Sequence, residues 1–167
     1  MADKPRDRYI LALTIWNPWA AMIADGYKTI ENRSWGTHRT GLLAIHAAVG
    51  AGTRTDQEHA IATAARLASL PRDVVERSME VRGAVIAVAR LTGVCSLSLH
   101  VPPGEPLACD CGPWAFPGQR HFRLTSVRAL PEPVPCCGAQ KFWELPDDVY
   151  EAILPTAKKV AREGRPQ

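Results

Sequence analysis

Three charged residues, Lys28, Glu31 and Arg33, lie in one short stretch and form the clearest candidate site in the sequence. An arginine can hold a carboxylate in a planar, charge-assisted ion pair, which leaves the lysine to bind an anion or to polarise a carbonyl group. The same residues also suit a structural salt bridge at the edge of a sheet, with the lysine in solvent. The local pattern leaves both interpretations open.

The residues before this cluster predict a short apolar helix. Asn17 is a favourable N-cap, because its side-chain oxygen can accept from amides of the first turn, and Pro18 suits the first helical position. Gly26 is suited to end the helix in the left-handed conformation. We therefore expect free amides of Trp19 and Ala20 to attract a phosphate or a carboxylate, and Asn17 beside them is itself a candidate for ligand contact.

A strand that follows Gly26 would place Glu31 and Arg33 on the same face, because alternate residues of a strand point to the same side. Lys28 has the opposite parity. It can join the other two only if it still belongs to the turn, or if a bulge intervenes. Ser34 and Trp35 follow directly and are further candidates for ligand contact.

Several segments carry a resemblance to a known family. The chain reads IWNPWA at Ile15–Ala20, G-x-K-T-I-E-x-R-S-W at Gly26–Trp35 and G-x-x-x-I-H-A at Gly41–Ala47. This succession resembles the opening of an ASCH (activating signal cointegrator homology) domain, a member of the PUA-like superfamily. Supporting segments lie at 83–89, 114–118, 133–136 and 141–146, so the resemblance extends over roughly residues 9–150.

The resemblance implies an α+β fold, a small mixed PUA-like β-barrel with helices packed around it. It also implies a cleft beside the G-x-K-x-x-E/T-x-R motif that takes RNA or a modified nucleobase. Some members of the family resemble RNA-binding modules, and others are amidohydrolases acting on N4-acetylcytidine. In the amidohydrolase pattern a threonine three residues after the lysine supplies the nucleophile. Glu31 stands there in this chain, and a carboxylate would instead have to activate water as a general base.

Two main hypotheses follow. In the first, the cleft binds RNA or a nucleotide-like small molecule: Lys28 and Arg33 receive phosphate, Glu31 accepts hydrogen bonds from a base edge, and tryptophans stack on bases. In the second, the protein is a hydrolase of a modified nucleoside or of RNA, in which Lys28 polarises the scissile group and Glu31 activates water with help from His46. A third possibility is a protein-interaction role for the helical segment at 55–82, which an exposed apolar patch would favour.

Tryptophans near the motif are ambiguous between stacking and packing. Trp114 lies in a segment, 99–117, that is rich in Pro, Gly and Cys and that the family resemblance places over the cleft. An aromatic ring there can stack on an unpaired base, worth ~1–3 kcal/mol, or it can plug the end of the barrel. Trp16, Trp19 and Trp35 share this ambiguity, whereas Trp143 is expected in the core.

Cysteine spacing gives little sign of a metal site. The five cysteines include a C-x-C and an adjacent pair, and four thiols could meet only if the loop around Cys109 and Cys111 reaches that of Cys136 and Cys137. Zinc sites usually show C-x₂₋₄-C spacing, which neither pair has, although His100 or His121 could replace a cysteine. An odd count in a chain expected to be cytoplasmic also disfavours a disulfide framework. We therefore expect reduced thiols, no metal and no cofactor.

Composition predicts one domain without a membrane segment. The chain has 167 residues, 46% of them hydrophobic, and a formal net charge of +3, which is modest for a protein that binds duplex nucleic acid. No apolar run is long enough to cross a bilayer, and the polar start lacks a secretory signal, so we expect a cytoplasmic protein. The sequence does not determine its oligomeric state.

The expected organisation is a flexible N-terminus at 1–8, an ASCH/PUA-like domain at 9–154 with a helical insertion at about 55–82, and a tail or short helix at 155–167. Hydrophobic periodicity and turn residues predict the elements within it. The expected strands are 9–15, 42–48, 84–94, 122–129 and 141–145, and the expected helices are 55–70, 72–82 and 147–152.

Overall fold

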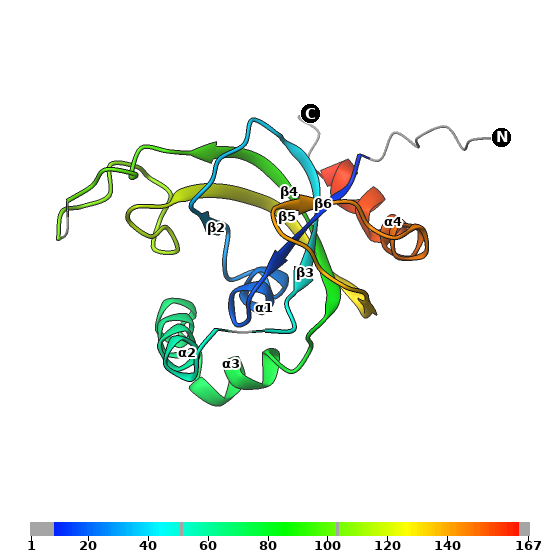
Figure 1. The fold of residues 1–167 in the computed structure, drawn as a ribbon, viewed down its shortest axis with the longest axis horizontal. Helices are drawn as coiled ribbons and strands as arrows, with labels where there is room; N and C mark the ends of the chain where they lie inside the picture. Colours follow the sequence, from blue (N-terminus) through cyan, green and yellow to red (C-terminus); the bar gives the residue numbers. More distant parts are fainter. Residues whose placement is uncertain (1–8, 51, 103, 164–167) are drawn as a thin grey trace.

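A six-stranded mixed sheet, curled into a half-barrel, is the centre of the fold (Figure 1). The computed structural model describes residues 9–50, 52–102 and 104–163. The strands are β1 (Leu11–Ile15), β2 (Ile30–Arg33), β3 (Gly41–Ala47), β4 (Ala84–Cys95), β5 (Arg120–Pro135) and β6 (Phe142–Trp143). The helices are α1 (Trp19–Ala24), α2 (Arg54–Ala68), α3 (Arg72–Ser78) and α4 (Asp147–Glu163).

Strand order in the sheet is β2-β5-β4-β3-β1-β6, so β2 and β6 lie at its two edges. β1 pairs in parallel with β3, and the other pairs are antiparallel. The long β4–β5 pair has three register shifts, and such bulges bend and twist a sheet locally. This curvature gives the sheet its half-barrel shape, which agrees with the expected PUA-like α+β fold.

Side chains alternate between two layers of core on the faces of the sheet. Ala12 and Ala44 face α4, whose Ile153 is fully buried against them. The neighbouring residues Leu13 and Ile45 point the other way, into the cluster that contains residues of α1. A third cluster joins α1 to α2 and α3, which lie on the side of the sheet away from α4 (Figure 1).

α4 differs most from expectation among the helices. The sequence predicted a helix at 147–152 and a separate tail or short helix from 155, but α4 is one helix that continues through Pro155 to Glu163. Val149, Ile153, Ala157 and Val160 form one buried stripe that extends past the proline. Burial of this stripe therefore outweighs the ~3 kcal/mol that an interior proline costs a helix. None of the described helices is long and apolar enough to cross a membrane.

Other bounds were mostly close to the expected ones. β5 and α3 are the exceptions. β5 runs to Pro135, where a strand at 122–129 was expected, and its far end pairs with the start of β4. α3 ends at Ser78, whose hydroxyl donates to the carbonyl of Val75, rather than at Arg82. The predictions for residues 1–8 and for the last four residues lie outside the described part of the chain.

Candidate functional site

The turn between α1 and β2 decides where Lys28 points. Gly26 has a φ of +82° and its N–H donates to the carbonyl of Ile23, as expected for a glycine that ends a helix. The N–H of Lys28 donates to the carbonyl of Met22 at 2.9 Å, and β2 begins only at Ile30. Lys28 therefore belongs to the turn, and the alternation of strand faces does not direct it away from Glu31.

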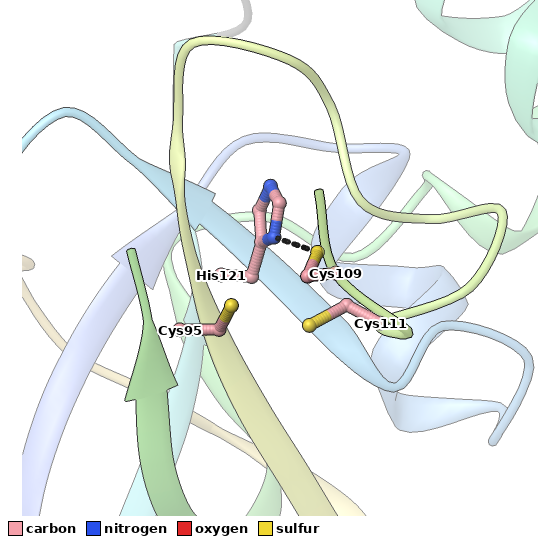
Figure 2. A group of neighbouring side chains, drawn as sticks. All are labelled: Cys95, Cys109, Cys111 and His121. Atoms are coloured by element: carbon pink, nitrogen blue, oxygen red, sulfur yellow. Dashed lines mark hydrogen bonds between the residues drawn. The ribbon is translucent and has the colours of Figure 1, made fainter. Parts of the chain in front are cut away.

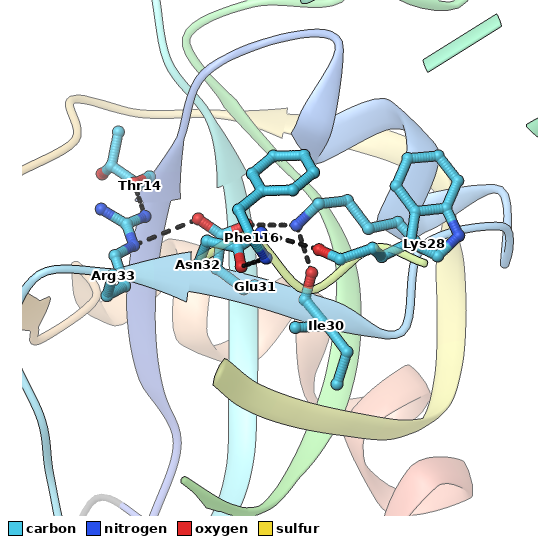
Figure 3. A network of polar contacts seen from close by, with 8 residues as sticks. Thr14, Lys28, Ile30, Glu31, Asn32, Arg33 and Phe116 are labelled. Carbon is cyan, nitrogen blue, oxygen red and sulfur yellow. Dashed lines mark hydrogen bonds and ion pairs between the residues drawn. The ribbon is translucent and has the colours of Figure 1, made fainter. Parts of the chain in front are cut away.

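The structure brings Lys28, Glu31 and Arg33 together (Figure 3). Lys28 Nζ lies 2.6 Å from Glu31 Oε2, and Arg33 Nε lies 3.1 Å from Glu31 Oε1. Lys28 Nζ also donates to the carbonyl of Ile30, and Arg33 Nη2 donates to that of Thr14 at 2.7 Å. One carboxylate thus bridges two cations, each of which is held by the backbone as well.

This network is buried to a degree that is unusual for charged groups. Lys28 is 1% exposed and Glu31 is 5% exposed. Burial lowers the pKa of Lys28, and the attraction of Glu31 opposes that shift. Lys28 Nζ also lies 5.9 Å from the centre of the Trp19 ring, within range of a cation–π contact. Desolvating such groups is costly, so a buried network of this kind beside a cavity is a candidate functional site.

Two adjoining cavities open onto the network. The first, of about 290 Å³, is lined by Trp19, Lys28, Glu31, Asn32, Phe116, Pro117 and Gln119. The second, of about 280 Å³, is lined by Thr14, Ile15, Trp16, Trp19, Glu31, Asn32 and Arg33. They share Trp19, Glu31 and Asn32, and we call them together the Glu31 cleft. Its lining combines a carboxylate, two cations and aromatic rings, a combination suited to a planar, polar ligand.

Asn32 and Phe116 are cleft residues that the sequence did not reveal. Asn32 Nδ2 donates to the carbonyl of Trp114, and Asn32 Oδ1 accepts from the N–H of Phe116, both at 2.9 Å. The two bonds fix the β4–β5 loop to β2, so that the Phe116 ring lies edge-on to Trp19, with 5.8 Å between ring centres. Asn32 occupies an unspecified position of the motif, and no local signal linked it to a residue 84 positions away.

Trp114 and Trp35 are packed rather than presented to the cleft. Trp114 is 6% exposed, belongs to the core cluster of α1 and α2, and contacts Trp19 edge-on. Trp35 lies edge-on to both Phe122 and Phe142, with ring centres 5.1 Å apart in each case. These contacts favour the packing alternative for both tryptophans. Of the tryptophans left open between stacking and packing, Trp19 lines both cavities and Trp16 lines the second.

One of the two amides expected to be free at the start of α1 is hydrogen-bonded within the chain. The N–H of Ala20 donates to the carbonyl of Trp16, and that of Ala21 donates to Asn17 Oδ1, each at 3.2 Å. Asn17 Nδ2 in turn donates to the carbonyls of Met79 and Val81. The prediction of free first-turn amides was therefore wrong at Ala20, and the Asn17 side chain ties α1 to the segment after α3.

Ser34 and His46 also lie outside the cleft lining. Ser34 is exposed, and its carbonyl accepts from Arg120. His46 is buried on the α4 side of the sheet, where Nε2 lies 3.0 Å from the carbonyl of Cys136 and the ring packs edge-on to Trp143. The expectation that His46 stands near Lys28 and Glu31 was wrong, because it lies on the opposite face of the sheet.

His46 should instead affect the pH dependence of stability. Burial lowers its pKa below the ordinary value of about 6.5, although the bond to Cys136 opposes the shift. As the pH falls from about 6.5 towards the lower folded value, the unfolded state binds a proton that the folded state does not. The free energy of unfolding should therefore fall over this window, and His46→Gln should flatten the decrease in urea unfolding experiments.

The exposed His38 provides the matched control for this prediction. His38→Gln should leave the pH dependence as it is in the native chain. Equal flattening by both substitutions would contradict the assignment to His46, and so would an unchanged slope in His46→Gln.

Comparison with known proteins agrees with this architecture. The model of the ASCH domain matches residues 13–100. The chain is also similar to a solved structure described as the crystal structure of ASCH from Zymomonas mobilis, with a TM-score of 0.50 and 14% sequence identity. That match covers 89% of this chain and 96% of the other, and at this identity it supports the fold alone. No curated protein matches the chain.

Proposed function

Because the chain belongs to the ASCH domain family, which is associated with nucleic acids, we propose that the Glu31 cleft binds RNA or a nucleoside-like ligand. The observation that carries this proposal is the buried carboxylate of Glu31, held between Lys28 and Arg33 at a cavity with aromatic walls. A nucleobase combines a flat apolar face with hydrogen-bond donors along its edge. Its binding site therefore needs an aromatic surface for the face and a hydrogen-bond acceptor for the edge.

Each group has a definite role in this proposal. Trp19 and Phe116 receive the faces of the base, and Glu31 accepts hydrogen bonds from amino or imino groups on its edge. Lys28 is buried and engaged by Glu31 and Ile30, so it positions the carboxylate. Arg33, whose side chain is 22% exposed, is better placed to meet a phosphate.

The size of the cavity and the net charge of the protein favour a nucleoside or an unpaired base over a duplex as the ligand. A cavity of about 290 Å³ is just below the ~300–1,000 Å³ typical of small-molecule sites. The net charge of +3 also falls short of the dense cationic surface that duplex binding requires.

Binding can be tested with a labelled, mixed-sequence single-stranded RNA by fluorescence polarisation, and with cytidine 5′-monophosphate and N4-acetylcytidine by calorimetry. Loss of one stacking partner, worth ~1–3 kcal/mol, should weaken binding about 5- to 150-fold in Trp19→Ala and in Phe116→Ala. The control is Tyr27→Ala, which removes an exposed ring that lines neither cavity. The proposal fails if none of these probes binds saturably, or if Tyr27→Ala weakens binding equally.

A hydrolase is the second candidate, and the lowered pKa of the buried Lys28 beside Glu31 favours it. Among the described residues, no side chain that lines the first cavity bears a hydroxyl group. In the second cavity, the hydroxyl of Thr14 accepts a hydrogen bond from Trp143 Nε1. Hydrolysis would therefore use water, with Glu31 as general base and Lys28 polarising the amide or phosphodiester.

Turnover separates the two candidates. If N4-acetylcytidine or RNA is hydrolysed, and Glu31→Gln abolishes turnover while affinity stays nearly intact, the cleft is catalytic. If neither is turned over, and Arg33→Gln weakens RNA binding with a smaller salt dependence, the binding function stands.

The structure lends no support to a protein-docking role for the helical insertion. α2 and α3 expose no large apolar side chain, and Val81 is the one exposed in the segment 54–82, which is described throughout. A single exposed valine does not form a docking patch.

A further inference from the structure

We propose that Cys95, Cys109, Cys111 and His121 form a structural Zn²⁺ site where β4 ends and β5 begins (Figure 2). One ligand atom from each residue lies within 4.8 Å of all the others. Cys95 and His121 are direct partners in the β4–β5 register, and the two remaining cysteines come from the loop that joins these strands. The site is independent of what the Glu31 cleft binds.

The geometry needs little adjustment to become tetrahedral. With Zn–S bonds of ~2.3 Å and Zn–N bonds of ~2.0–2.1 Å, ligand atoms around a tetrahedral zinc lie about 3.5–3.8 Å apart. Cys109 Sγ and His121 Nδ1 are already 3.3 Å apart. Figure 2 shows the sulfur atoms and Nδ1 turned towards a common centre, so small side-chain rotations suffice.

The hydrogen bond of the His121 ring to the backbone favours the tautomer that a metal ligand needs. Its Nε2 lies 2.8 Å from the carbonyl oxygen of Phe116, which can only accept a hydrogen bond, so Nε2 carries the proton. Nδ1 is then left with a lone pair directed at the thiols. A backbone carbonyl that fixes the ring in this way is typical of zinc-bound histidines, and here the ring is fully buried.

The surroundings also accommodate the charge of bound thiolates. Three thiols would release their protons on binding Zn²⁺, leaving a net charge of −1 on the site. Arg123 Nη2 lies 3.4 Å from Cys111 Sγ and offsets that charge, and the Ser98 hydroxyl donates to Cys109 Sγ at 3.3 Å. Thiolate and imidazole ligands in a closed set of four favour zinc over harder cations.

Zinc at this point would hold the β4–β5 loop on the sheet. The loop contributes Phe116 to the cleft wall, and the carbonyl of Phe116 is bonded to the ligand His121. Metal removal should therefore loosen the loop and leave the far side of the sheet unaffected. This effect is measurable by hydrogen exchange, without reference to any ligand of the cleft.

The test uses the full chain, purified with a thiol reductant and without chelator. Metal analysis should find a single Zn²⁺ per chain, and exchange with Co²⁺ should give the visible bands of tetrahedral, thiolate-bound cobalt. Cys109→Ser and Cys111→Ser should lose both signals. Cys136→Ser and Cys137→Ser, at the far end of the β4–β5 pair, are matched controls and should keep them. Chelation should accelerate hydrogen exchange at 96–102 and 104–119.

Variants that fail to fold do not decide the outcome, because the native chain is titrated as well. The proposal is overturned if the reduced native chain takes up neither Zn²⁺ nor Co²⁺. It is also overturned if Cys137→Ser abolishes binding as Cys109→Ser does, or if mass spectrometry finds a disulfide among Cys95, Cys109 and Cys111 in the reduced preparation.

Discussion

Glu31→Ala is expected to lower the free energy of unfolding by about 3–5 kcal/mol, the usual cost of removing one partner from a buried ion pair. Lys28 would remain almost completely buried with its ammonium group facing an empty space, and Arg33 would lose the same partner. Urea unfolding followed by circular dichroism measures this change.

A matched control and a rescue make this result specific. Glu163→Ala removes the exposed ion pair with Arg128, so it should leave the free energy of unfolding nearly unchanged. Adding Lys28→Met to Glu31→Ala should recover much of the lost stability, because no unpaired buried ammonium group then remains. A loss below about 1 kcal/mol in Glu31→Ala would show that Glu31 does not stabilise the buried charges of Lys28 and Arg33 as proposed.

Asn17→Ala is expected to lower the free energy of unfolding by about 2–4 kcal/mol while leaving affinity for the RNA probe unchanged. The Asn17 side chain is 3% exposed and makes three hydrogen bonds. The substitution would leave the carbonyls of Met79 and Val81 and the N–H of Ala21 without this partner. Chemical unfolding and fluorescence polarisation give the two quantities on the same preparation.

Thr53→Ala is the control for this prediction, because it removes the exposed N-cap of α2 and should cost about 1 kcal/mol. If Asn17→Ala instead weakened RNA binding strongly with little loss of stability, Asn17 would be a ligand contact, as the sequence first indicated.

Local sequence signals predicted the cluster of Lys28, Glu31 and Arg33. Gly26 marked the end of α1, and the requirement that Lys28 stay in the turn was met because β2 begins only at Ile30. Strand alternation correctly placed Glu31 and Arg33 together. These predictions succeeded because they depend on the conformations of adjacent residues.

Predictions about distant neighbours were less successful. Periodicity assigned His46 to a strand correctly but did not show which face of the sheet it occupies. The amide of Asn17 was expected at a cap, and its bonds to residues over 60 positions away depend on how α3 packs. Similarly, Cys95 and His121 are joined by the register of β4 and β5, which cysteine spacing does not encode.

The bond between Arg33 and the carbonyl of Thr14 connects the two margins of the half-barrel. β2 lies at one margin, and β1 is next to the last strand at the other. Arg33 Nη2 thus joins β2 to β1 from the two sides of the curled sheet through a side-chain hydrogen bond rather than through strand pairing. A ligand phosphate that drew the Arg33 guanidinium away from Thr14 would therefore remove this connection between the two margins.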